Sequence, residues 1–173
     1  MGPRPVIRPE RAGDAPAVRA VTAAAFGRSD EADLVERLRR VPGYLGLVAV
    51  SSASLRAGSE GAVVGHVAFT PVALEAAPSR LYGLAPMAVA PERQRRGVGT
   101  ALVLEGLGAC RRAGVDAVFV LGHPAYYPRF GFRVAPVGNE YGAPPEAFMA
   151  LELTAGALEG VSGTVRYDRA FAG

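Results

Sequence analysis

Residues 81–122 restrict the fold of this chain more than any other segment, because two apolar runs there flank a basic, glycine-bearing turn and a helix-forming stretch. The second run, residues 117–122, is apolar without alternation, which is typical of a buried strand. Between the runs, residues 98–113 carry apolar side chains around most of a helical surface. The segment therefore predicts one strand–helix–strand crossover within a sheet.

The rest of the chain predicts two more helices and several strands. One helix is expected to begin at Asp14 as N-cap, with Pro16 in its first turn, and to run to Phe26. A second is expected over residues 30–41, opened by acids and closed by arginines. Strands are expected at 6–8, 46–52, 62–70, 81–89, 117–122, 132–135 and 148–153. A short helical piece is expected at 126–130, a hairpin connection at 57–61 and a turn at 78–80. We expect one α+β domain over residues 1–173, with a mixed, mostly antiparallel sheet flanked by helices.

The residues available for catalysis exclude two enzyme classes and make a metal site improbable. Cys110 is the only cysteine, and His66 and His123 are the only histidines, so neither an intrachain disulfide nor a metal site is expected. All 19 basic residues are arginines, so no lysine can form a Schiff base or complete a Walker motif. Cys110 is expected to be a buried small hydrophobe, and His66 a hydrogen-bonded core or cleft residue.

The sequence has no recognisable membrane span or secretory signal, and this predicts a cytoplasmic protein. No window approaches 18 uncharged apolar residues, and the N-terminus lacks the apolar region of a secretory signal. The net charge of +3 is spread along the chain rather than clustered. No segment resembles a recognition helix or an aromatic-basic platform. We therefore expect neither a membrane nor a nucleic acid as a partner.

The turn before the helix at residue 98 has the composition of an anion-binding site. The first N–H groups of a helix lack intrahelical acceptors, and the helix dipole adds partial positive charge there. Gly97 and Gly99 have no Cβ atoms, so an anion can approach the main chain closely. Three arginines add charge beside them: Arg93, Arg95 and Arg96. Together these features predict a pyrophosphate cradle that needs no metal.

Two other phosphate-binding motifs fail on the residues of this turn. The dinucleotide fingerprint would require glycine where Leu102 stands, and it should follow a strand almost directly. The Walker motif requires a lysine that the chain lacks. A tight turn without a ligand remains the alternative to a cradle.

The run Gln94-Arg95-Arg96-Gly97-Val98-Gly99 matches the pattern Q/R-x-x-G-x-G/A. With its lead-in Val89-Ala90-Pro91, it resembles the acyl-CoA loop of the GNAT N-acetyltransferase superfamily. A second family feature, Tyr-x-x-x-Gly-Phe, stands at residues 127–132. The wider run 121–132 resembles a bacterial subgroup of predicted N-acetyltransferases, and the resemblance is strongest over 84–132.

This resemblance implies a GNAT-like fold and transfer of an acetyl group from acetyl-CoA to a primary amine by direct attack, without a metal. The acceptor would be a small-molecule or peptide amine, contacted by residues 12–41, 74–80 and 136–145, and a homodimer is possible. Main-chain groups of three strand residues would pair with the pantetheine arm: Met87, Ala88 and Val89. The loop would hold the pyrophosphate through Gln94, Arg95, Arg96, Gly97, Val98, Gly99 and Thr100.

The resemblance also implies catalytic roles. Tyr127 matches the family's general acid, although packing in a small hydrophobic core is an alternative and Tyr126 could substitute for it. Many family members carry a glutamate base on the strand before the loop, whereas residues 81–89 contain no acid. His123 is our candidate base, with capping of its own turn as the alternative. The missing glutamate leaves open a second function, a catalytically degenerate relative that binds acyl-CoA as a sensor or interaction module.

Overall fold

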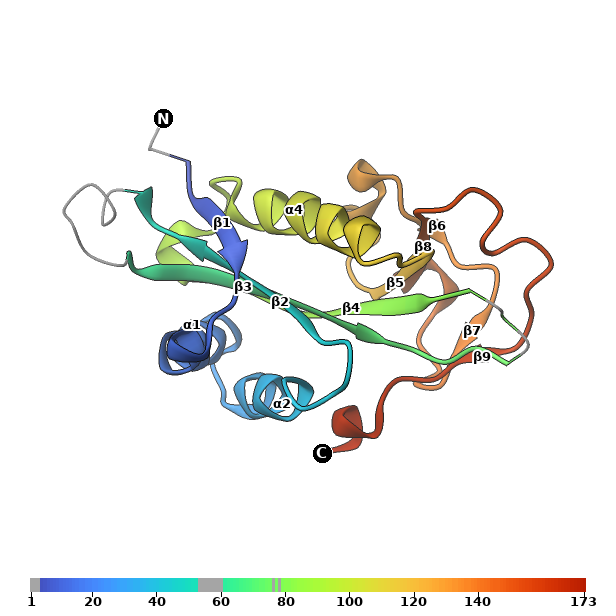
Figure 1. Ribbon diagram of the computed structural model, residues 1–173, viewed down its shortest axis with the longest axis horizontal. Coiled ribbons are helices and arrows are strands. Elements are labelled where there is room, and N and C mark those ends of the chain that lie inside the picture. The colour runs from blue at the N-terminus through green and yellow to red at the C-terminus, as the bar shows by residue number, and fades with distance from the viewer. Residues whose placement is uncertain (1–3, 53–60, 76, 78) are drawn as a thin grey trace.

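The computed structural model describes residues 4–52, 61–75, 77 and 79–173, and it places one central sheet between two layers (Figure 1). The sheet has seven strands in the order β1-β2-β3-β4-β5-β8-β6. Only β4 and β5 pair in parallel; the other neighbours are antiparallel. Its strands are β1 (Val6–Pro9), β2 (Leu45–Val50), β3 (Val63–Pro71), β4 (Leu81–Val89), β5 (Ala117–Leu121), β6 (Arg133–Val134) and β8 (Phe148–Glu152). Strands β7 (Gly138–Asn139) and β9 (Thr164–Val165) form a separate parallel pair.

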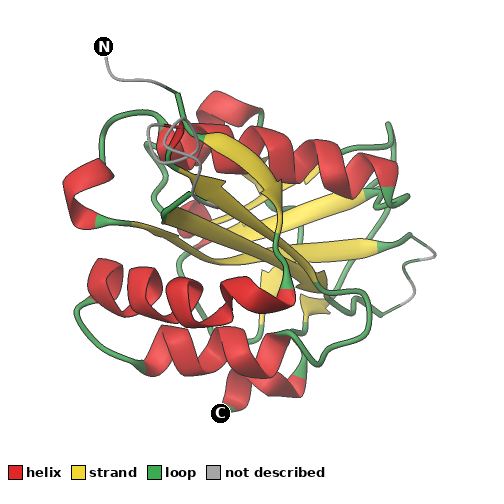
Figure 2. Cartoon of the chain, turned by 60° about the vertical axis from the view of Figure 1, so that its left-hand side comes forward, coloured by secondary structure: helices red, strands yellow, loops and turns green. Residues whose placement is uncertain are grey.

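Helices cover both faces of the sheet (Figure 2). Helices α1 (Ala15–Phe26) and α2 (Asp30–Leu38) lie on one face, and α4 (Val98–Arg112) lies on the other. Short 3-10 turns occur at Ala12–Asp14, Pro91–Arg93, Tyr127–Phe130, Pro145–Ala147 and Arg169–Ala172. Helix α4 connects β4 to β5 and is the predicted crossover. Within the described residues, no helix combines the length and the apolar character needed to span a bilayer.

Alternating side chains of the central strands fill a core on each face of the sheet. The core toward α4 includes Tyr82, Val118 and Val120 from the strands and Leu102, Leu107 and Cys110 from the helix. On the opposite face, Val48 and Val50 pack against Val18 and Val35 of the two N-terminal helices. Farther along that face, the cluster contains Leu81, Phe119, Phe148 and Val165.

Cys110 confirms the expectation of a buried small hydrophobe. Its side chain is fully buried on the inner face of α4. Burial raises the pKa of the Cys110 thiol to about 12, so the thiolate is scarcely populated at neutral pH.

Two helix termini differ from the sequence prediction. Asp14 precedes α1, but its carboxylate does not cap the helix. It accepts hydrogen bonds from the Arg8 guanidinium at 2.7 and 2.9 Å and from the Arg11 N–H at 2.7 Å. Helix α2 ends at Leu38 instead of residue 41. Pro42 explains the early end, because proline has no N–H to donate to the Leu38 carbonyl four residues earlier, and its ring crowds that carbonyl.

The predicted strands agree with the observed ones to within two residues at each end. The sequence prediction omitted β7 and β9, because two-residue strands are too short to show a period of two. The predicted connection at 57–61 lies outside the described residues except for Gly61, and so does Pro78 of the predicted turn.

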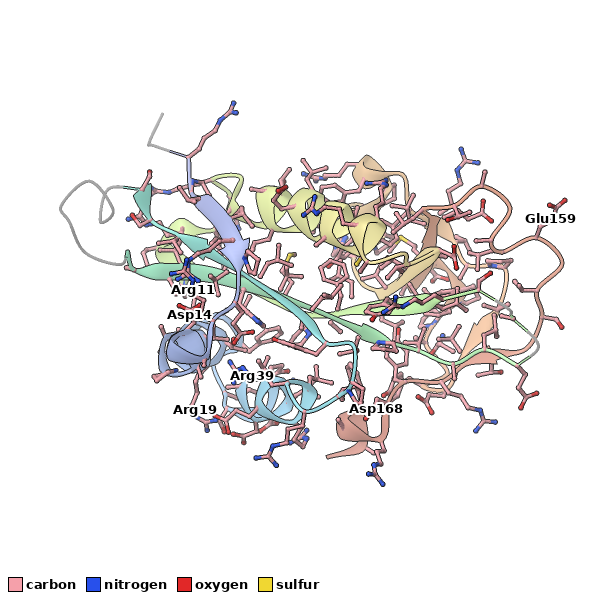
Figure 3. The ribbon with its side chains drawn as sticks, in the orientation of Figure 1. Arg11, Asp14, Arg19, Arg39, Glu159 and Asp168 are labelled. Carbon is pink, nitrogen blue, oxygen red and sulfur yellow. The ribbon has the colours of Figure 1, made fainter. Side chains whose placement is uncertain are left out.

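A buried polar network ties the end of α2 to the sheet and confirms the expectation for His66, which is fully buried in β3. Its Nε2 lies 3.1 Å from Glu10 Oε2 and 3.1 Å from the Tyr44 hydroxyl. Tyr44 donates to Glu10 at 2.6 Å, and Arg39 Nε donates to the other carboxylate oxygen at 2.7 Å. Figure 3 shows Arg39 beside α2, on the side that faces the sheet. Burial raises the pKa of Glu10, but the hydrogen bonds of the network outweigh burial and lower it to about 2.

Glu10 should stabilise the fold in a pH-dependent way. Because its folded-state pKa lies below the ordinary value of 4.5, its contribution is present above about pH 4.5 and is lost as the pH falls toward 2. Glu10→Gln removes the charge that Arg39 requires, and should lower the free energy of unfolding at pH 7 by about 3 kcal/mol. Urea denaturation measures this loss. The difference between wild type and variant should shrink between pH 5 and pH 3, and a constant difference would contradict the assignment.

Candidate active site

Strands β4 and β5 diverge after three paired residues. Residues 81–83 of β4 pair with residues 117–119 of β5. Beyond them, β4 stays paired with β3 as far as Val89, and β5 stays paired with β8 as far as Leu121. The last part of β4 therefore has no pairing along one edge within the described sheet. We call the gap between residues 84–89 of β4 and residues 120–121 of β5 the β4/β5 fork.

The register of β3 and β4 decides which peptide groups face the fork. The Ala90 N–H donates to Val64 of β3 at 2.9 Å. In an antiparallel ladder, alternate residues bond to the same neighbour, so the main chain of Ala88 also faces β3. The peptide groups of Met87 and Val89 point the other way, into the fork. Of the three residues predicted to contact pantetheine, two present main-chain groups there and Ala88 does not.

Gln94 is already engaged with the protein. Its side-chain amide donates to the Val89 carbonyl at 3.1 Å, across the 3-10 turn formed by Pro91–Arg93. This bond uses the Val89 carbonyl oxygen, which lies at the open end of the fork, and leaves the Val89 N–H available. Gln94 therefore fixes the course of the loop in this structure.

The start of α4 presents unsatisfied amides. Gly97 is the N-cap residue, and having no side chain it cannot cap the helix. The first intrahelical bond runs from Ala101 to Gly97 at 3.0 Å, so the amides of residues 98–100 have no acceptor in the helix. Gly97 and Arg95 both have positive φ, 82° and 57°. Such left-handed turns direct successive N–H groups toward one side of the chain, where an anion can be held.

Charge around this helix start is uncompensated. Arg95 and Arg96 are exposed. Within the described part of the chain, no carboxylate forms an ion pair with either, and no side chain accepts a hydrogen bond from residues 98–100. The predicted cradle is thus not filled by the described side chains of the protein itself.

A cleft of ≈ 300 Å³ lies between this helix start and the fork. It is lined by Ala25, Phe26, Met87, Val89, Gln94, Arg95, Gly99 and Tyr126. A Cβ atom on Gly99 would lie 3.0 Å from the Tyr126 hydroxyl and 3.6 Å from the Met87 methyl group. Gly99 therefore keeps the cleft open. The sequence did not predict the cleft role of Phe26; its only signal is an apolar residue at the end of α1 that remains 41% exposed.

The two tyrosines near the fork have different surroundings. Tyr127 is 8% exposed and packs edge-on against Tyr126 and Phe132, with ring centroids 5.1 and 5.7 Å apart. Burial raises the pKa of Tyr127 to about 12. Its side chain forms no hydrogen bond with the described residues, and its hydroxyl is not among the fully buried polar atoms. The Tyr127 ring is part of the hydrophobic core, while its hydroxyl group remains accessible.

His123 lies just beyond the end of β5, and its side chain is exposed. Its Nδ1 accepts a hydrogen bond from the Ala125 N–H at 3.2 Å. This contact is the turn-capping role that was the alternative to a catalytic one. Among the described residues, no group of three potential ligands could hold a metal ion.

Residues 6–135 match the family described as an acetyltransferase (GNAT) domain. The chain belongs to the GNAT acetyltransferase family. It is 37% identical over 171 residues to the uncharacterized N-acetyltransferase YhbS of Escherichia coli, spanning 96% of this chain and 98% of the relative. The crystal structure of YhbS from Escherichia coli in complex with CoA covers 100% of this chain and 96% of its own, with a TM-score of 0.88.

A second solved GNAT acetyltransferase, from Brucella melitensis and in complex with acetyl-CoA, is 36% identical. It covers 96% of this chain and 97% of its own, with a TM-score of 0.77. These matches confirm the predicted family, the mixed sheet with its crossover, and the enzyme class. They also agree with acetyl-CoA as the co-substrate. The family match ends at residue 135, so β7, β8 and β9 of this GNAT acetyltransferase lie beyond it.

Gly99→Val should abolish tight CoA binding, because the new side chain would enter the cleft beside the helix amides. We expect the dissociation constant for CoA, measured by calorimetry, to rise at least about tenfold. Gly108→Val is the matched control, because a Cβ on Gly108 of the same helix meets only the flexible Arg112 side chain, at 3.3 Å. Equal losses in the two variants would mean that the helix itself, rather than the cleft, had been damaged.

Proposed function

We propose that this GNAT acetyltransferase transfers an acetyl group from acetyl-CoA to a primary amine, by direct attack of the amine on the thioester. The observation that carries the proposal is the pairing of two unsatisfied surfaces. Unpartnered amides at the start of α4 suit an anion, and an unpaired edge of β4 beside them suits an extended chain. Coenzyme A matches both surfaces in the same order, because its pyrophosphate is an anion and the pantetheine arm joined to it is an extended chain.

In this proposal, the loop grips the pyrophosphate through main-chain N–H groups from Arg95 to Thr100. Arg95 and Arg96 add positive charge at the exposed rim, where arginine can bind phosphate oxygens bidentately. The pantetheine arm lies along the fork and pairs with the peptide groups of Met87 and Val89, as an added strand would. Gln94 holds the turn in place through its bond to the Val89 carbonyl.

The chemistry then requires three groups besides the reactants. The amine nitrogen attacks the thioester carbon, and a fork-facing N–H of β4 stabilises the developing oxyanion. The C–S bond breaks, and Tyr127 supplies a proton to the departing thiolate. The proton lost by the amine passes to a base or to water. The products are the acetylated amine and coenzyme A.

The raised pKa of Tyr127 favours a role as proton donor in one respect and opposes it in another. With a pKa raised to about 12 it carries its proton throughout the neutral range. A reference thiol titrates near 8.5, so a transfer from this phenol to the thiolate is uphill by about 5 kcal/mol. The donation must therefore be concerted with C–S cleavage or assisted by the changed surroundings of the bound donor.

Release of thiol on mixing acetyl-CoA with a panel of amines tests the proposed function. Acceptor-dependent release supports it, and slow hydrolysis that ignores the amines contradicts it. Tyr127→Phe should lower kcat about 100-fold, as expected for loss of a positioned acid, with little change in the KM for acetyl-CoA. Tyr126→Phe is the matched comparison, since it removes the neighbouring hydroxyl. A larger loss of kcat in Tyr126→Phe would assign the acid role to Tyr126.

His123 is our candidate for the base. Its Nδ1 accepts from Ala125, whereas its Nε2 has no hydrogen-bond partner within the described residues. Neutral imidazole can accept a proton in the pH range where the acceptor amine must lose one. His123→Ala should change the pH–rate profile of kcat, which reports groups of the enzyme–substrate complex. An unchanged profile would leave His123 with its turn-capping role alone and assign the base to water or to another residue.

A further inference from the structure

The chain after residue 135, where the family match ends, passes next to the apex of the β4/β5 fork, which is the point where the two strands separate. Gly83 is the last residue of β4 that pairs with β5. A Cβ on Gly83 would lie 2.8 Å from the Tyr167 ring and 3.1 Å from Val72. Tyr167 follows β9, in a segment joined by an antiparallel bridge between Arg166 and Ala73, which lies just after β3. The Tyr167 ring therefore occupies the place that a side chain at residue 83 would take.

This contact lies on the face of the sheet opposite α4. Tyr82 packs into the core beneath α4, so Gly83, its neighbour in the strand, presents its Cβ direction to the other face. Helices α1 and α2 cover the same face farther along the sheet (Figure 2). Figure 3 shows Asp168, the residue after Tyr167, at the segment that passes beside α2. The 3-10 turn that follows contacts α2.

Tyr167 is the centre of an aromatic cluster that includes Tyr141 and Phe171. Its ring centroid lies 5.5 Å from that of Tyr141, with planes at 45°, and 5.1 Å from that of Phe171, with planes at 65°. Tyr141 is 52% exposed, so part of its ring surface is accessible. The Tyr167 side chain makes no hydrogen bond with the described residues, and its hydroxyl is not fully buried. All three aromatics come from the chain after residue 135.

A carboxylate lies beside this cluster. The Glu140 carboxylate accepts a hydrogen bond from the Tyr167 N–H at 2.6 Å, which places its negative charge beside the rings. Burial raises the pKa of Tyr141, and the charge of Glu140 raises it further. Aromatic faces also attract ammonium groups and pack against flat apolar bodies.

The expected path of the donor along β4 ends near this aromatic cluster. If the pyrophosphate lies at the start of α4, the pantetheine arm enters the fork at Val89 and runs toward Gly83, about 20 Å along the strand. The thioester then lies toward the apex, with the donor arm behind it. An attacking amine must approach from the side that the donor leaves open, and Tyr167 borders the apex on the face opposite α4.

Building on the proposed acetyltransferase activity, we propose that Tyr141, Tyr167 and Phe171 form the acceptor site, and that the favoured acceptor is a primary ammonium compound with an aromatic ring close to its nitrogen. Tyr167 determines specificity by touching the ring of the acceptor at the apex of the fork. Tyr141 supplies the outer wall of the site.

Calorimetric titration of CoA-saturated protein with 2-phenylethylamine and with n-butylamine tests this site without relying on turnover. We expect 2-phenylethylamine to bind at least about tenfold more tightly than n-butylamine. Tyr141→Ala should abolish most of that preference, while affinity for CoA stays within about twofold. Leu104→Ala is the matched control, because Leu104 is 57% exposed on α4, on the opposite face of the sheet. It should leave the preference unchanged.

Tyr167→Phe should retain the ring preference, and Tyr167→Leu should lose it while keeping CoA affinity. Equal binding of the two amines to wild type, or equal loss in Leu104→Ala and Tyr141→Ala, would overturn the proposal. Absence of amine binding to CoA-saturated wild type would also overturn it. That outcome is separate from a failure of the proposed function, which shows as absent acceptor-dependent thiol release across the full amine panel.

Discussion

The divergence of β4 from β5 is the constraint on which the rest of this enzyme depends. A strand in the middle of a sheet normally satisfies its peptide groups on both sides, and leaving one edge unpaired is unfavourable unless something else binds there. Strong pairing with β3 on one side and the α4 core underneath hold β4 in place while that edge stays open. The result is a main-chain binding surface inside the molecule, positioned by packing rather than by any single side chain.

A division of labour between the parts of the chain follows from this arrangement. The segment that matches the family supplies the open edge, the loop and the helix start, and in the proposed function all three act mainly through peptide groups and glycines. The segment after residue 135 contributes side chains, notably Tyr141 and Tyr167, on the other face. In the proposals made above, recognition of the donor needs little side-chain identity, whereas recognition of the acceptor depends on it.

Much of this organisation could be predicted from the sequence, and the limits have physical causes. The crossover was predictable because β5 is continuously apolar and α4 carries apolar residues around most of its surface. The position of the loop was predictable because Gly97 and three arginines stand just before a helix-forming stretch. The roles of Ala88 and Gln94 were not, because they depend on strand register and on one local hydrogen bond. The contact between Tyr167 and Gly83 joins residues 84 positions apart and leaves no local signal.

The burial of Cys110 has a practical consequence for enzymology. A single sulfhydryl that is sealed inside the α4 core and held in its protonated form reacts slowly with disulfide and electrophilic reagents. Colorimetric detection of free coenzyme would then register product alone, with no background from the folded polypeptide. By the same reasoning, the enzyme should resist mixed-disulfide formation with oxidised coenzyme A, and a slow rise in reagent uptake would report unfolding.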